Sequence, residues 1–346
     1  MPPDVALGTE IKALGTENKG GVEGALGTEN KGGVEELSMA DKVCVFAGQG
    51  AQAVGMGKDL AAADPAVMAL FDRANQVTGV DLKKIVFEGP MEELTKSSNC
   101  QPAIFVTSVA CWTAFRKQYP AATFKMAAGL SLGEWTALHA AGVLDFDSTL
   151  RVLEARGRFM QQACEEQAGG MISVMGATQD QLKEICAKTG LVMANINSDA
   201  QVVLSGAKAG VDEAAKLAAA AGLKGIVLPV AGAFHSPLMA SARERLAAVL
   251  KDVAFKAPAM PVLANVTGQP HAADGAAIRD AMLRQVTESV RWADCIRTAM
   301  AAGAGTFVEF GPGKVLSGLI KRIDKQNATF NVSDAGSLAA AAPAAN

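Results

Sequence analysis

The sequence predicts an α/β fold with a mainly parallel sheet, interrupted by a smaller inserted unit. Two observations predict it. The first is an apolar strand at 124–128 that runs through a glycine-flanked serine directly into a helix. The second is the stretch 169–230, which alternates as strand, helix, two strands, helix and strand, the βαββαβ order of ferredoxin-like units. Apolar strands resume at 260–265 and 306–310, so the smaller unit lies within the larger one.

Each strand is expected where a short apolar run ends at turn residues, and each helix where apolar residues recur at helical spacing. The expected elements are strands at 42–47, 124–128, 171–176, 191–196, 201–205, 224–230, 260–265 and 306–310, and helices at 65–78, 102–118, 134–141, 178–188 and 207–221. The glycine-rich turn Gly48–Gln52 ends the first strand. Thr178 and Gln181 resemble a capping box, and Gly142 suits the position directly after its helix.

The ends of the chain are not expected to belong to the folded part. Ala13–Gly24 and Ala25–Glu36 are two nearly identical copies of one glycine-rich, polar segment, which cannot bury enough surface to fold. The expected organisation is a disordered tail at 1–38, a core at 39–167 and 232–326, an inserted subdomain at 168–231 and a loose C-terminal tail at 327–346.

Composition places the chain among ordinary globular proteins. Its 346 residues exceed what one compact core usually takes, so two structural units are expected. The net charge of −3 gives no reason to expect nucleic acid or a membrane surface as a partner. No apolar run approaches the roughly 20 residues that cross a bilayer. Six scattered cysteines and three histidines predict no metal site and a reducing compartment.

Ser131, in Gly129-Leu130-Ser131-Leu132-Gly133, is the predicted nucleophile of an enzyme that forms an acyl ester. Between a strand and a helix, its oxygen would project above the sheet edge, next to the N–H groups and positive dipole end of the helix. A side chain at either glycine would collide with the neighbouring strand or helix. The alternative is a serine that only caps a helix in a glycine-rich turn.

A serine nucleophile needs a base, and the choice is among three histidines. His139 falls within the same predicted helix as Ser131 and is interpreted as structural. His271 lies in a polar loop and is expected to be solvated. His235 follows an apolar strand, in a loop where catalytic groups gather, and elimination favours it.

No acid stands in an obvious position as the third member of a triad. Asp199, Asp212 and Glu309 are available, but none has a distinctive setting. A backbone carbonyl that accepts from the second ring nitrogen of His235 would serve equally well.

Six motifs, in order, resemble those of malonyl-CoA:acyl-carrier-protein transacylases over about Lys42 to Asp324. They are Phe46–Gln52, Gly129–Glu134, Arg156–Met160, Gly232–His235, Arg284–Val286 and Gly311–Leu316. The resemblance implies an α/β-hydrolase-like core with an inserted ferredoxin-like subdomain, in agreement with the order of elements above.

The resemblance also implies a role for each matching residue. Ser131 would be acylated, with His235 as general base and then general acid, held by the backbone carbonyl of Gln285. The backbone N–H groups of Gln49 and Leu132 would form the oxyanion hole. Arg156 would bind the free carboxylate of malonyl, because a planar guanidinium matches a carboxylate; without the resemblance it would be read as a solvent-facing arginine. Further substrate contacts are implied for Phe234 and Asn197.

Leu130 replaces a histidine found in many members, and Trp135 replaces the usual tyrosine. Leu130, together with Val230–His235 and Asn265–His271, looks most like plant and algal plastid members, so plastid stroma is the expected location and cytoplasm the second choice. The implied partners are malonyl-CoA and holo-acyl carrier protein. Neither a cofactor nor a metal is expected, nor contact with nucleic acid or membrane, and the chain is expected to be a monomer. Lys224, Lys321 and Arg322 are candidates for contact with an acidic carrier.

The expected activity is transfer of malonyl from coenzyme A to the phosphopantetheine thiol of the carrier. One alternative is a serine esterase or thioesterase, which would have no use for Arg156 and would normally show a triad acid. Another is a module that holds acyl carriers without turnover, against which an intact Ser131 and His235 argue.

Overall fold

The computed structural model describes residues 41–345, so the duplicated segment and the tail predicted at 1–38 lie outside the described residues. Between residues 41 and 345, none of the helices combines the length and apolar character that a membrane crossing requires.

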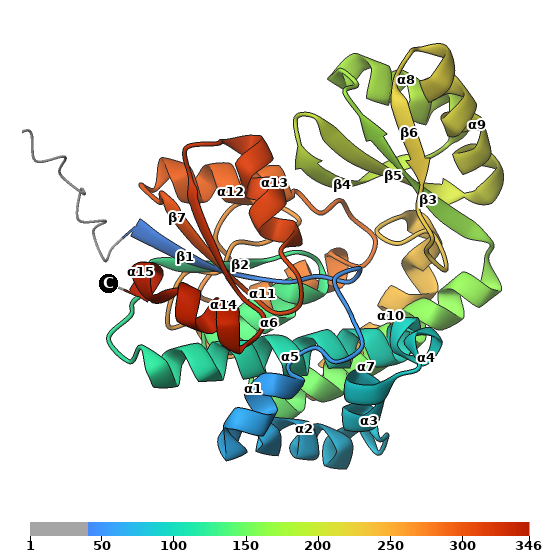
Figure 1. The fold of residues 1–346 in the computed structure, drawn as a ribbon. Coiled ribbons are helices and arrows are strands. Elements are labelled where there is room, and N and C mark those ends of the chain that lie inside the picture. Colours follow the sequence, from blue (N-terminus) through green and yellow to red (C-terminus); the bar gives the residue numbers. More distant parts are fainter. Residues whose placement is uncertain (1–40, 346) are drawn as a thin grey trace, which may run out of the picture. The chain divides into compact units, whose positions relative to one another are not determined.

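The parallel sheet, sheet A, carries the site at one edge. Its strands are β1 (Lys42–Phe46), β2 (Met126–Gly129), β7 (Thr306–Phe310) and β8 (Ala328–Val332). They are all parallel and lie in the order β2-β1-β7-β8 (Figure 1). Since parallel strands end at the same edge, the loops after β1, β2 and β7 meet there.

Alternate residues of β1 face opposite sides of sheet A, as the two-residue period of a strand requires. Val43 and Val45 pack in a cluster with residues of α12 (Trp292–Ala301) and α13 (Val315–Ile323). Phe46 packs on the other side, in the larger cluster with α5 (Ser97–Gln118) and α7 (Phe146–Glu166). Because sheet A is covered on both faces, β1 is apolar on both sides after Lys42.

The second sheet, sheet B, is antiparallel. It consists of β3 (Gly169–Met175), β4 (Val192–Ser198), β5 (Gln201–Ala207) and β6 (Lys224–Val227), in the order β4-β5-β3-β6. Helices α8 (Gln179–Thr189) and α9 (Lys208–Ala220) share an apolar cluster with it. This is the predicted ferredoxin-like arrangement, and the capping box of Thr178 and Gln181 is present.

The remaining helices complete the described part of the chain. They are α1 (Lys58–Ala63), α2 (Pro65–Thr78), α3 (Leu82–Glu88), α4 (Met91–Thr95), α6 (Leu132–Ala140), the 3₁₀ turn η2 (Pro237–Met239), α10 (Ala240–Leu250), α11 (Gly275–Arg284), α14 (Ala335–Ala340) and α15 (Ala342–Ala345).

Three expectations about elements are wrong. Helix α5 begins at Ser97, five residues before the predicted start at Pro102, because its first turn packs closely against Gly157 of α7. The strand predicted at 260–265 forms only isolated bridges, of which Ala127–Val262 joins it to β2. The tail from 327 is not loose: β8 pairs with β7 throughout, and Val332 is fully buried.

Candidate active site

The elbow around Ser131 is built by two glycines. A Cβ atom on Gly129 would lie 2.0 Å from the carbonyl carbon of Gly133, and one on Gly133 would lie 2.2 Å from the carbonyl oxygen of Phe46. The turn from β2 into α6 can therefore close, and α6 can approach β1, only without side chains at these positions. Ser131 is the N-cap of α6 and has φ 55° and ψ −106°, a strained conformation for a residue with a side chain.

Asn265 holds this turn in place from the far side of β2. It is fully buried, its Oδ1 accepts from the Ser131 backbone N at 2.8 Å, and its Nδ2 donates to the Gly129 carbonyl at 2.8 Å. Both ends of one amide are thus used to fix the strained turn. Nothing in the sequence around Asn265 reveals this role.

His235 lies against Ser131, with its Nε2 2.8 Å from the serine Oγ. Its Nδ1 is 2.7 Å from the backbone carbonyl of Gln285. Because a carbonyl can only accept, the proton is on Nδ1, and the neutral ring accepts from Ser131 through Nε2. Burial, and then the charge of Arg156, lower the pKa of His235 to about 4, so the ring is neutral at pH 7.

Arg156 projects from α7 into the same cluster and is 1% exposed. It donates through Nη2 to the Ser131 Oγ at 3.1 Å and to Gln285 Oε1 at 3.0 Å, and through Nη1 to Gln101 Oε1 at 2.7 Å. Burial lowers its pKa to about 10, against the opposing charge of Glu134. Arg156 thus stays charged at pH 7, beside the serine oxygen.

Close packing of α5 against α7 explains why Arg156 reaches Gln101. A Cβ atom on Gly157 would lie 2.2 Å from the carbonyl oxygen of Ser97, so the two helices touch where the glycine follows the arginine. The reading of Arg156 as a solvent-facing arginine, made from the residues alone, is wrong. The glycine at 157 is the sequence feature that could have indicated a buried face.

The backbone N–H groups of Gln49 and Leu132 come from the loop after β1 and the first residue of α6. Among residues 41–345, neither of these N–H groups is hydrogen-bonded to a protein acceptor. The loop after β1 approaches the elbow closely, because a Cβ atom on Gly48 would lie 2.5 Å from the carbonyl oxygen of Leu130.

The other implied substrate residues differ in their placement. Phe234 precedes His235 in the chain and is buried in the larger cluster. Asn197 lies on β4 of sheet B, and its buried Oδ1 has no hydrogen-bond partner among the described residues. No hydrogen bond within residues 41–345 joins Asn197 to Ser131 or His235.

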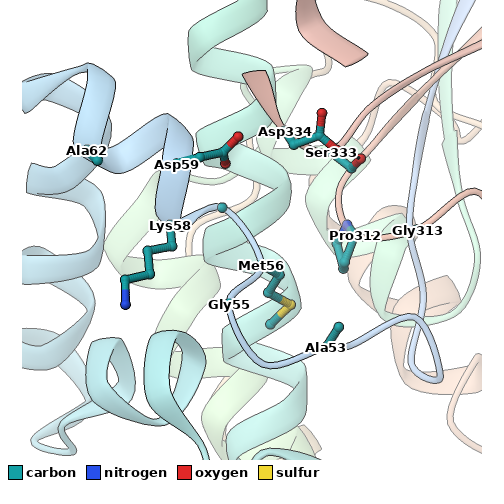
Figure 2. Close-up of a pocket in the computed structure, with 11 residues that line it drawn as sticks. Ala53, Gly55, Met56, Lys58, Asp59, Ala62, Pro312, Gly313, Ser333 and Asp334 are labelled. Carbon is teal, nitrogen blue, oxygen red and sulfur yellow. Dashed lines mark hydrogen bonds between the residues drawn. The ribbon is translucent and has the colours of Figure 1, made fainter. Parts of the chain in front are cut away.

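A cavity of about 380 Å³ opens at His235 and is lined also by Pro237, Val266, Glu288 and Arg291. A larger cavity, of about 490 Å³, is lined by the loop after β1, by Pro312 and Gly313 after β7, and by Ser333 and Asp334 after β8 (Figure 2). His235 lines the smaller cavity and not the larger one, and Ser131 lines neither, so His235 is what links the smaller cavity to the site.

The acids considered for the triad have other partners. Asp199 pairs with Arg297, and Asp212 with Lys208. Glu309 accepts from the first N–H groups of α13, at Leu316 and Ser317. The orienting acceptor beside His235 is the Gln285 carbonyl.

The remaining histidines have defined contacts. His139 Nδ1 bonds to the Leu144 carbonyl, in keeping with a structural role. His271 was expected to be solvated, and this is wrong: its side chain is 2% exposed and bonded to Glu134. A polar loop sequence does not reveal that the loop folds over the buried side of α6.

Comparison with known proteins places this geometry in one family. Residues 43–342 match the model of the acyl transferase domain family. The malonyl CoA-acyl carrier protein transacylase of Haemophilus influenzae is 40% identical over 298 residues, which are 85% of this chain and 95% of that protein.

Two solved structures have the same fold. One is the malonyl-CoA:acyl carrier protein transacylase of Xanthomonas oryzae, with a TM-score of 0.84, 37% identity and coverage of 87% of this chain and 97% of the other. The other is a malonyl-transacylase solved with a type II PKS acyl-carrier protein, with a TM-score of 0.83, 38% identity and coverage of 87% and 98%. The organisms named are bacteria and give no support to a finer likeness with plastid members. This chain belongs to the malonyl CoA-acyl carrier protein transacylases, within the acyl transferase domain family.

Proposed function

We propose that this protein transfers malonyl from malonyl-CoA to the phosphopantetheine thiol of holo-acyl carrier protein through a malonyl ester on Ser131. One observation carries the proposal: a buried, charged guanidinium, that of Arg156, lies 3.1 Å from a serine Oγ that is itself 2.8 Å from a neutral histidine. A nucleophile paired with a fixed cation suits an acyl group that ends in a carboxylate.

In the first half-reaction, Nε2 of His235 takes the proton of Ser131 Oγ as the oxygen attacks the thioester carbonyl. The oxyanion of the tetrahedral intermediate accepts from the N–H groups of Gln49 and Leu132. The C–S bond then breaks, and His235 gives its proton to the departing sulfur of coenzyme A. The products are the malonyl ester of Ser131 and free coenzyme A.

The second half-reaction uses the same groups in reverse. The phosphopantetheine thiol gives its proton to His235 while its sulfur attacks the ester carbonyl. The C–O bond breaks, and the Ser131 oxygen recovers its proton from His235. Throughout, the Gln285 carbonyl keeps Nδ1 protonated and stabilises the imidazolium that forms.

Selectivity for malonyl is assigned to Arg156. Its Nε and Nη2 lie on one edge of the guanidinium, and among the described residues the buried Nε has no hydrogen-bond partner. A carboxylate on this edge would pair with both nitrogens beside the Ser131 Oγ. An acetyl group would leave the buried Nε unpaired, which is the cost that allows a site to reject a substrate lacking the carboxylate.

The carrier is proposed as the second substrate on two grounds: the family and the related malonyl-transacylase solved with an acyl-carrier protein. Of the surface candidates, Lys224 is exposed on β6. Lys321 and Arg322 are bonded to the Lys325 carbonyl and to Gln201. Carrier contact by these three residues stays a prediction, as do a monomeric state and the absence of nucleic-acid binding.

Plastid stroma also stays a prediction, from Leu130 together with Val230–His235 and Asn265–His271. It would be contradicted if a fluorescent fusion in a plant cell remained in the cytoplasm.

The proposed route is tested by intact-mass measurement of the full chain after addition of malonyl-CoA. We expect a mass increase of one malonyl group on the wild type and none on Ser131→Ala. Addition of holo-acyl carrier protein should then discharge the enzyme and charge the carrier. An increase that persists on Ser131→Ala would exclude the serine ester, and discharge to water at the same rate would favour an esterase.

A further inference from the structure

Two titratable side chains outside the proposed mechanism are buried directly behind it. Glu134 lies one turn after Ser131 on α6 and its side chain is 1% exposed; the His271 side chain is 2% exposed. The Glu134 Oε1 accepts from His271 Nε2 at 2.7 Å. Its Oε2 accepts from Gln285 Nε2 at 2.6 Å.

Gln285 joins this pair to the site. Its Nε2 donates both protons, one to Glu134 and one to the Ser131 carbonyl at 2.9 Å. Its Oε1 accepts from Arg156 Nη2 at 3.0 Å, and its backbone carbonyl accepts from His235. Reversing this amide would set donors against the Arg156 guanidinium and an oxygen against two acceptors, so a single orientation is allowed.

Glu134 also offsets the buried charge of Arg156. A guanidinium that is 1% exposed is costly without a nearby anion, and the charge of Glu134 raises the pKa of Arg156 against the effect of burial. The carboxylate in turn needs partners on both oxygens, and His271 supplies the second one. Removing His271 would leave a buried carboxylate oxygen unpaired and free Glu134 to turn away from Gln285.

We propose that Glu134 and His271 form a positioning pair, which holds Gln285 in the orientation that presents Oε1 to Arg156 and thereby fixes the guanidinium beside Ser131. Neither residue touches the acyl group, so both act through Gln285. The inference rests on the proposed function, because the property it sets is the preference for an acyl group that ends in a carboxylate.

The test compares kcat/KM for malonyl-CoA with kcat/KM for acetyl-CoA on the full chain, with holo-acyl carrier protein as acceptor. His271→Leu should lower the malonyl-to-acetyl ratio about tenfold, the effect of losing one hydrogen bond to a charged group. His271→Gln, which keeps a donor, should restore most of the ratio. His139→Asn is the matched control: that histidine lies near the end of α6 and bonds to the Leu144 carbonyl beyond the helix, so the change should leave the ratio unchanged.

Thermal unfolding shows whether His271→Leu is folded. If it is not, Glu134→Gln provides a second measurement of the same ratio. It should also lower the ratio, because the charge near Arg156 is lost and the amide adds a donor. An unchanged ratio in the folded variants would overturn the positioning role. This holds also when malonyl and acetyl transfer fall by the same factor, because that result marks a purely structural pair. If malonyl-CoA does not acylate the wild type, the proposed function fails first, and the inference with it.

Discussion

Ser131 and His235 face each other with the same unusual backbone: φ is 55° for the serine and 56° for the histidine, and 2.8 Å separates Oγ from Nε2. No other residue with a side chain has positive φ among residues 41–345. A buried amide residue contacts each of them: Asn265 accepts from the Ser131 backbone N–H, and the backbone carbonyl of Gln285 accepts from the His235 ring. Strain kept only at two interacting groups indicates a preorganised site.

Replacement of Arg156 should separate the two acyl substrates. Arg156→Ala removes the cation that would pair with the malonyl carboxylate, so kcat/KM for malonyl-CoA should fall at least about a hundredfold. Acetyl transfer should be kept or gained, because its methyl group no longer meets the buried, unpaired Nε of Arg156. Steady-state kinetics with both thioesters measures this.

The control is Arg158→Ala, two residues along α7, where the side chain is exposed and paired with Glu154. This change should leave both substrates unaffected. If malonyl and acetyl transfer fall together in Arg156→Ala, then Arg156 is a structural residue.

The pH dependence of acylation should reflect the lowered pKa of His235. The base must be neutral to accept the serine proton, and burial lowers its pKa to about 4. Acylation by malonyl-CoA should therefore vary little from about pH 7 down to about pH 5 and fall as pH approaches the pKa. Stopped-flow measurement of kcat/KM across this range is the check; a midpoint near the ordinary histidine value would show that the ring is not desolvated in solution.

Gly133→Ala should disrupt the elbow. The new Cβ would lie 2.2 Å from the Phe46 carbonyl oxygen, a backbone atom of the central strand that cannot move aside. We expect a loss of stability on the order of 3 kcal/mol and loss of acylation, measured by chemical unfolding and intact mass. Gly318→Ala on α13 is the matched control: its Cβ meets nothing within 4 Å, and the change should be neutral or stabilising. Similar behaviour of the two variants would contradict this account of the elbow.

Asn265→Ala should weaken the same turn without a steric clash. It removes two buried hydrogen bonds, to the Ser131 N–H and to the Gly129 carbonyl, and leaves both backbone groups unpaired. The expected cost is about 2 kcal/mol in unfolding, with slower acylation because Ser131 is no longer fixed. Asn331→Ala, at a partly buried surface site, should change neither property. Acylation at the wild-type rate would show that the glycines alone hold the turn.

Much of the fold could be predicted from local pattern. Periodicity and turn residues, which act over a few positions, predict the boundaries of α2 and β7 and the capping box at Thr178. They also predict the order of elements in the unit that forms sheet B. The errors at Pro102 and at 327–346 have another origin. In both places, packing against a distant segment decided the structure. The start of α5 packs against α7, and β8 pairs with β7.

The same division runs through the site. By itself, the sequence determined the elbow at Ser131 and, by elimination among three histidines, the partner His235. The elbow is recognised from glycines close to the serine in the sequence, and His235 from the small number of histidines. What only the tertiary structure decided is the support behind them: Asn265 on the turn, Gln285 between His235 and Arg156, and the buried contact of Glu134 with His271. The contact of His235 with Gln285 joins residues 50 positions apart, and each of the others joins residues more than 100 positions apart. Local sequence patterns do not reveal such contacts, but burial makes each partner necessary once the chain has folded.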